Sequence, residues 1–176
     1  MDQFTSNPII ENILNGYQSI LKDDYPIYRN HVYRIYYLAL SLDSNPENSD
    51  KYAIAASFHD IGIWTHSFDY IAPSIQLATE YLELNNLTDW NEEISLMIDN
   101  HHKISVYKGE YDSVEVFRKA DWVDVVMGIK MYGISKSVFK SVKKVFPIKG
   151  FHCFLIKQTA QYFLKSPLNP LPMFKR

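Results

Sequence analysis

Residues 57–64, with the sequence SFHDIGIW, set two adjacent polar side chains in an apolar surrounding. Successive residues of a helix point about 100° apart, so His59 and Asp60 cannot lie on one face of a helix. A buried carboxylate is costly unless it is paired or bound to a metal. The fold therefore has to provide a partner for this pair, and Gly62 is placed to end a helix beside it.

Helical periodicity surrounds this stretch on both sides. Apolar residues recur every three to four positions, and no convincing alternation of period two is present. The expected caps are Asn7, Ser49 and Asp112, with a capping box formed by Asp89 and Glu92. The predicted helices cover residues 7–22, 27–42, 49 to the His-Asp pair, 72–85, about 89–102, 112–130, 135–145 and 151–165. The predicted fold class is all-α, a bundle of seven to eight helices in a single domain.

Composition narrows the class of protein. The chain has 176 residues, 47% of them hydrophobic and 22% charged, which is typical of one globular domain. No apolar run approaches the ~20 residues that span a membrane, and the first residues show no signal peptide pattern. The single cysteine, Cys153, excludes an intrachain disulfide and a cysteine-based zinc cluster. We therefore expect a cytoplasmic protein without a membrane partner.

Charge is unevenly distributed along the chain. Residues 1–124 hold 8 basic and 20 acidic residues, whereas residues 125–176 hold 10 basic residues and no acidic ones. Such asymmetry can attract an acidic partner or a phosphate group, although a solvated basic face packed on an acidic body explains it as well. The aromatic residues of the basic part recur at helical spacing, which favours a core over base stacking. Nucleic acid is therefore not the expected partner.

Four short stretches collect nearly all of the potential metal ligands. They are NHVYR (30–34), FHD (58–60), DNHHK (99–103) and KADWVD (119–124). Taken singly, each has a plain explanation, such as a hydrogen-bonded core histidine, an ion pair of Arg34 with Asp60, or a solvated helix end. Taken together, imidazoles and carboxylates form a nitrogen–oxygen set suited to a divalent ion such as Mn, Fe, Co, Ni, Zn or Mg.

The ordered set of motifs resembles the HD-domain superfamily of metal-dependent phosphohydrolases. The resemblance rests on H-x-x-R at His31 and Arg34, HDIG at 59–62, a helix ending in two histidines, and an Ala-Asp opening at 120–121. It covers about residues 25–130 and leaves the basic C-terminal part, 131–176, without a counterpart. It implies an HD-type helical fold and hydrolysis through a metal-bound water.

The resemblance also implies roles for particular residues. The ligands of one divalent ion would be His31, His59, Asp60 and Asp121. Asp60 would also orient or deprotonate the attacking water, and Arg34 would clamp an anionic oxygen of the substrate. Further positive charge, or a proton for the leaving group, would come from His101, His102 and Lys103.

One position departs from the pattern of two-metal members of that superfamily. Tyr70 stands where those members have a histidine at the start of the helix after HD, and His66 lies out of register. A second ion would lack one of its imidazoles, so one ion is expected rather than two. The same departure counts against a di-iron oxygenase.

Three functions are consistent with these residues. The leading expectation is a phosphohydrolase that acts on a nucleotide or another small phosphorylated metabolite. The second is a hydratase or di-iron oxygenase of a small organic substrate, and the third is a catalytically silent, metal-binding regulatory domain. The expected partner is a small anionic molecule, and the sequence permits a homodimer without requiring one. Residues 103–111 would form either a lid over the site or a plain connection.

Overall fold

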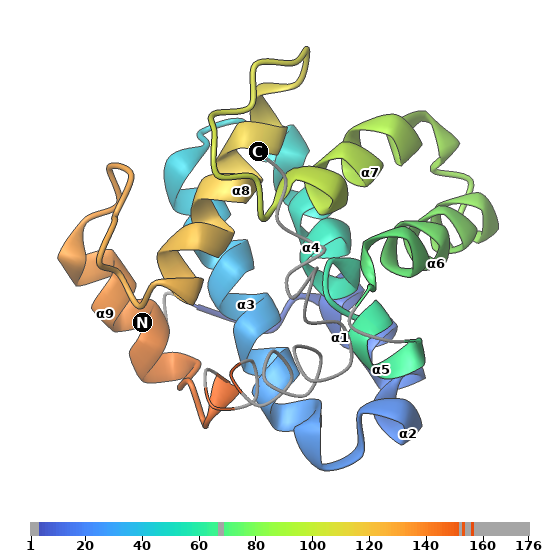
Figure 1. The fold of residues 1–176 in the computed structure, drawn as a ribbon, viewed down its shortest axis with the longest axis horizontal. Coiled ribbons are helices and arrows are strands. Elements are labelled where there is room, and N and C mark those ends of the chain that lie inside the picture. The colour runs from blue at the N-terminus through green and yellow to red at the C-terminus, as the bar shows by residue number, and fades with distance from the viewer. Residues whose placement is uncertain (1–3, 67–68, 152, 154–155, 157–176) are drawn as a thin grey trace, which may run out of the picture.

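The computed structural model describes residues 4–66, 69–151, 153 and 156, which form an all-helical protein (Figure 1). In this part of the chain, seven helices have nine residues or more and two have four. The helices are α1 (Pro8–Gly16), α2 (Gln18–Leu21), α3 (Tyr25–Leu42), α4 (Ser49–Phe58), α5 (Gly62–Thr65), α6 (Ile71–Leu84), α7 (Asn91–Asn100), α8 (Asp112–Val125) and α9 (Lys136–Val145). The predicted all-α fold class is confirmed. Among the described residues, we find no helix that combines the length and the apolar character needed to cross a membrane.

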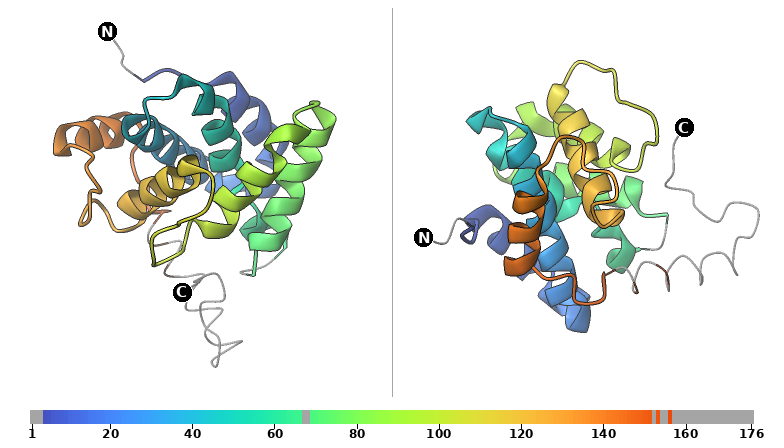
Figure 2. Two further views of the ribbon diagram at one scale, coloured as in Figure 1. Left: turned by 90° about the horizontal axis from the view of Figure 1, so that it is seen from above. Right: turned by 90° about the vertical axis from the view of Figure 1, so that its left-hand side faces the viewer.

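Helix α3 runs through the middle of the molecule, and the other helices are arranged around it (Figure 1). Helices α4 and α8 lie against α3, and α7 contacts both α4 and α8. Helix α6 pairs with α7 at the outer edge, whereas α9 contacts α3 on the opposite side of the molecule (Figure 2). The four ligand-rich stretches therefore lie on or beside four helices that contact one another.

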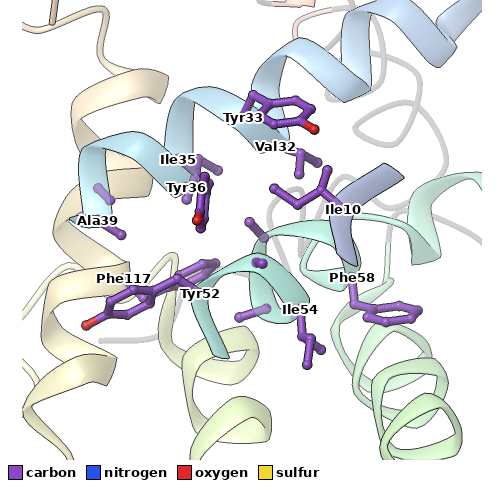
Figure 3. Close-up of a cluster of buried hydrophobic side chains, with 14 of the residues drawn as sticks. Ile10, Val32, Tyr33, Ile35, Tyr36, Ala39, Tyr52, Ile54, Phe58 and Phe117 are labelled. Carbon is purple, nitrogen blue, oxygen red and sulfur yellow. The ribbon is translucent and has the colours of Figure 1, made fainter. Parts of the chain in front are cut away.

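The hydrophobic core lies where α1, α3, α4 and α8 meet (Figure 3). Ile35 of α3, Ile54 of α4 and Phe117 of α8 are completely buried there. Each such side chain contributes about 1.5–3 kcal/mol relative to an exposed one. Ten of the eighteen residues of α3 are buried, including the polar His31 and Arg34. Because α3 is enclosed on nearly all sides, its polar side chains need partners inside the protein.

Asn7 is the only one of the three predicted single-residue caps that caps its helix. Asn7 caps α1 as predicted, because its Oδ1 accepts hydrogen bonds from the Ile9 and Ile10 N–H groups at 2.8 and 3.2 Å. The helix predicted over 7–22 is divided into α1 and α2. Ser49 and Asp112 are the first residues of α4 and α8 instead of their caps. A capping bond is absent at these starts among the described residues.

Further boundaries differ because irregular turns adjoin the helices. The predicted capping box at Asp89 and Glu92 does not form, since a 3₁₀ turn (Thr88–Trp90) leads directly into α7. Helix α8 ends before the predicted boundary at residue 130. Met127 and Gly128 follow it with φ of +54° and +76°, and this left-handed backbone stops a helix. The helix predicted over 151–165 lies largely outside the described residues.

Gly62 has a different role from the predicted one. Helix α4 already ends at Phe58, before the His-Asp pair, and Gly62 begins the short helix α5. A Cβ atom at this position would lie 2.5 Å from the Tyr70 carbonyl oxygen and 2.9 Å from Ser74 Oγ. Glycine is therefore required because the start of α6 approaches the backbone closely, and the Gly62 N–H donates to Ser74 Oγ at 3.0 Å.

Candidate metal centre

Three buried imidazoles and two buried carboxylates meet between α3, α4, α7 and α8. We call this set the ligand cluster, and its members are His31, His59, Asp60, His101 and Asp121. His31 lies on α3 and Asp121 on α8, whereas His59 and Asp60 directly follow α4 and His101 directly follows α7. All five residues are buried, and the most exposed of them, Asp60, has an exposed fraction of only 3%. The structure thus brings together all four predicted metal ligands and adds His101.

The donor atoms of the cluster are close enough to share an ion. Nε2 of His31 lies 3.6 Å from Asp60 Oδ2 and 3.8 Å from Asp121 Oδ1. The corresponding distances from His59 Nε2 are 3.4 and 3.9 Å. Each His or Asp supplies one donor atom, and those of His31, His59 and Asp121 all lie within 4.8 Å of one another. This spacing suits ligands that bind one ion at about 2.0–2.2 Å.

The three imidazoles present Nε2 to the centre because their other ring nitrogens are engaged elsewhere. His59 Nδ1 lies 2.8 Å from the Ala56 carbonyl oxygen, and His101 Nδ1 lies 2.5 Å from that of Ile98. A ring nitrogen that faces a carbonyl donates its proton to it, so the neutral form of each ring has its lone pair on Nε2. Neutral imidazoles with an inward lone pair are the form that binds metals.

Several buried polar atoms of the cluster have no hydrogen-bond partner among the described residues. They are Asp60 Oδ1, His101 Nε2 and both carboxylate oxygens of Asp121. An unsatisfied buried polar group costs about 1–3 kcal/mol, and more when it is charged. A divalent cation would satisfy the carboxylates and the imidazole lone pair together. The residues present therefore fit a metal ion.

The protein matches a known family over the residues that build this cluster. A family model for the HD domain matches residues 28–125, which include all five members of the cluster. The chain belongs to the HD-domain family. This match confirms the predicted resemblance. HD-domain proteins are mostly metal-dependent hydrolases that bind divalent metals. Searches among curated proteins and among solved structures found no match.

In this HD domain, Arg34 contacts protein groups rather than the space beside the ligand cluster. Its Nε and Nη2 donate to Asp124 Oδ1 and Oδ2 at 2.6 and 2.8 Å. Its Nη1 donates to the carbonyl oxygens of Phe146 and Pro147 at 3.2 and 3.3 Å, and the residue is completely buried. The predicted contact of Arg34 with a substrate is thus replaced by an ion pair, because α8 packs against α3 and brings Asp124 to it.

Asp124 stands directly behind a predicted ligand. Its Oδ2 lies 2.8 Å from His31 Nδ1. Burial raises the pKa of the Asp124 carboxyl, but the Arg34 guanidinium and His31 outweigh this effect and hold the pKa well below its ordinary value. A carboxylate in this place orients a liganding imidazole and increases its basicity. The sequence pattern does not single out Asp124, but its spacing of three from Asp121 places both on one helix face.

The remaining predicted site residues lie at the edge of the cluster or outside it. His102 Nδ1 is 3.7 Å from Asp121 Oδ2, and its Nε2 is 2.6 Å from the Tyr70 hydroxyl. Burial and the adjacent His101 lower the pKa of His102 well below its ordinary value, which opposes the predicted positive charge there. The Lys103 carbonyl accepts from Trp122 Nε1 at 3.1 Å, and the role of the Lys103 ammonium stays a prediction.

The two carboxylates of the cluster differ in their protonation. Burial raises the pKa of Asp121 to about 7, and interactions with His101 and His59 oppose this rise only in part. Burial would also raise the pKa of Asp60, but attraction to His59, His101 and His31 outweighs it and holds that pKa well below the ordinary value. Of the two carboxyls, Asp121 therefore has the higher pKa and is the one more readily protonated near neutral pH.

Metal binding is therefore expected to compete with a proton on Asp121. An ion must displace this proton below pH 7, so the apparent affinity for Co²⁺ should fall about tenfold per pH unit for each proton displaced. Above pH 7 Asp121 is deprotonated, so its titration should no longer change the metal affinity. Calorimetric titrations in buffers of different ionisation heat count the protons released. An Asp121→Asn variant should release fewer, and equal release by both proteins at pH 6 would exclude this competition.

Proposed function

We propose that this HD-domain protein is a metal-dependent hydrolase with one divalent ion held by His31, His59, Asp60 and Asp121. The observation that carries the proposal is the approach of the Nε2 atoms of His31 and His59 to 3.1 Å. The two atoms can hydrogen-bond only when one ring carries a proton on Nε2, whereas a cation beside them would receive a lone pair from each ring. When bound, an ion such as Mn, Fe, Co, Ni, Zn or Mg supplies a Lewis acid and lowers the pKa of a water molecule.

Asp60 is proposed to orient the attacking water as well as to bind the ion. Its Oδ2 faces His31 and His59, whereas its Oδ1 lies 3.4 Å from His101 Nε2. One oxygen can therefore serve as a ligand while the other accepts a proton. His101 Nε2 lies beside this oxygen, so it can take up the proton from Asp60 and later deliver it to the leaving group.

The proposed substrate is a phosphomonoester, such as a nucleotide or another small phosphorylated metabolite. Relation to the HD family supports this substrate class, because the family acts on small phosphorylated substrates. A divalent ion of this kind polarises a phosphoryl oxygen and positions water for attack at phosphorus. His102 and Lys103 lie where the chain continues past His101, and they are the proposed contacts of the substrate at the edge of the site.

Removal of the metal tests this function. Chelator-treated protein is expected to lose hydrolysis of nucleoside monophosphates and of p-nitrophenyl phosphate, and to regain it with Mn²⁺ or Co²⁺. His59→Ala should not regain it. His66→Ala is the matched control, because His66 is exposed and follows α5 away from the cluster. Hydrolysis that survives chelation, or that both histidine variants retain, would reject the proposal.

A second candidate is a reaction on a small uncharged substrate, as in a hydratase or a di-iron oxygenase. The observation in its favour is that both buried arginines are used internally. Arg34 pairs with Asp124, and Arg118 donates to both oxygens of Glu115 at 2.7 Å. Two equivalents of iron with an iron-specific spectroscopic signal would favour the oxygenase, whereas metal-dependent turnover of phosphomonoesters would reject this candidate.

A further inference from the structure

Residues 146–151 lie outside the family match and return to the metal centre. Helix α9 ends at Val145, and the chain then passes Pro147 and turns at Lys149 and Gly150. These two residues have φ of +47° and +90°, a left-handed conformation that glycine adopts without strain. The turn brings Phe151 against α3, where it is completely buried.

Phe151 stacks on the imidazole of the proposed ligand His31. The two ring centroids are 3.8 Å apart, and the ring planes are inclined by 23°. The imidazole thus has Phe151 on its face, Asp124 at Nδ1 and His59 at Nε2. Close packing of two buried rings at this distance restricts rotation of the imidazole about its Cβ–Cγ bond.

Backbone carbonyls of the same segment hold the residues behind that imidazole. The Pro147 oxygen accepts hydrogen bonds from Asn30 Nδ2 at 2.8 Å and from Arg34 Nη1 at 3.3 Å. The Phe146 oxygen accepts from the same Arg34 nitrogen at 3.2 Å. Arg34 in turn pairs with Asp124, the acceptor for Nδ1 of the imidazole. Residues 146–151 therefore restrain the His31 imidazole both at its face and, through Arg34 and Asp124, at Nδ1.

We infer that residues 146–151 are part of the metal centre and that Phe151 is a positioning residue for His31. The inference rests on the proposed metal binding by His31. Phe151 keeps the Nε2 atom of the imidazole directed toward the other ligands, while the ion itself is bound by the residues of the family match. The HD core of residues 28–125 is thus completed, in this chain, by a segment that follows it.

Metal affinity of full-length variants tests the inference, with Co²⁺ as the probe. Phe151→Ala should bind Co²⁺ about tenfold more weakly than wild type, since neighbours of liganding histidines typically contribute 10–100-fold in affinity. Its visible Co²⁺ absorption should also change, because the ligand geometry is no longer held. Phe151→Leu keeps much of the buried volume without the ring and should lie between the two. If the alanine variant does not fold, the leucine variant carries the comparison.

Phe139→Ala is the matched control. Phe139 is a nearly buried phenylalanine of α9, and its ring contacts the Lys143 ammonium, 5.1 Å from the ring centroid. Its replacement should lower the unfolding midpoint while the folded protein keeps wild-type Co²⁺ affinity and absorption. Wild-type affinity and absorption in both Phe151 variants would overturn the inference.

NMR spectra of the metal-free protein separate this inference from the proposed function. Long-range ¹H–¹⁵N correlations should show the His31 proton on Nδ1 in the wild type, and a mixture of tautomers in Phe151→Ala. If the wild type binds no Co²⁺ but this difference is seen, the metal proposal fails and the positioning of His31 stands. If the wild type binds Co²⁺ and the variant is unchanged in both measurements, the positioning role alone is rejected.

Discussion

Replacement of Asp60 by alanine should abolish both metal binding and hydrolysis. Both oxygens of this carboxylate face imidazoles of the ligand cluster, with Oδ2 toward His31 and His59 and Oδ1 toward His101. Its removal takes away one ligand and the proposed proton acceptor together. We expect Co²⁺ affinity to fall by more than about 100-fold, because loss of a ligand should cost more than the 10–100-fold contributed by residues around ligands. Co²⁺ titration and a phosphomonoester assay measure the two losses.

Asp50→Ala provides the matched control for this variant. Asp50 lies in the first turn of the same helix, α4, and is exposed. It should keep wild-type metal binding and turnover. The Asp60 variant should still show wild-type helix content by circular dichroism, because Asp60 lies between α4 and α5 and is part of neither helix. An Asp60→Ala protein that keeps bound metal and turnover would disprove the role of this carboxylate.

The second large effect is expected on stability. Arg34→Ala removes the guanidinium from a completely buried ion pair and leaves the Asp124 carboxylate without its main partner. Loss of one member of a buried pair costs about 3–5 kcal/mol, because the other charge stays away from water. Urea unfolding of the metal-free protein measures this loss as a decrease in the free energy of unfolding.

Arg29→Ala controls for the loss of an arginine from the same helix. Arg29 also lies on α3 and pairs with Glu11 at 2.5 Å, but 28% of each side chain is exposed. Exposed pairs contribute about 0.2–1 kcal/mol, so this variant should be close to wild type. If the two arginine variants unfold at the same urea concentration, Arg34 does not hold a buried charge.

The sequence predicts the ligand cluster better than it predicts the residues behind it. His31, His59, Asp60 and Asp121 all lie within residues 28–125, which match the HD family, and packing of α3, α4 and α8 brings them together. The partner of Arg34 could not be predicted, because Asp60 directly follows α4 and Asp124 lies on α8, and both helices contact α3. Only the packing of α8 on α3 decides between them.

Helical periodicity likewise predicts the helices better than their ends. The predicted end of α8 was wrong because Met127, a residue without special turn preference, adopts a positive φ. The starts of α4 and α7 follow 3₁₀ turns, which Ser49 and Asp89 do not reveal. Phe151 is one of the aromatic residues of the basic part that are helically spaced, and this spacing indicates that it lies in the core. Its contact with His31 depends on the turn after α9 and leaves no local pattern in the sequence.

The metal content of the wild-type protein, purified without added metal, tests the proposed centre most directly. Elemental analysis should find about one divalent metal ion per chain, as expected for one set of nitrogen and oxygen ligands. The metal-free protein should take up about one equivalent of Co²⁺ with the absorption of a nitrogen–oxygen site. Protein that carries no divalent metal and also fails to bind Co²⁺ would contradict a metal centre at His31, His59, Asp60 and Asp121.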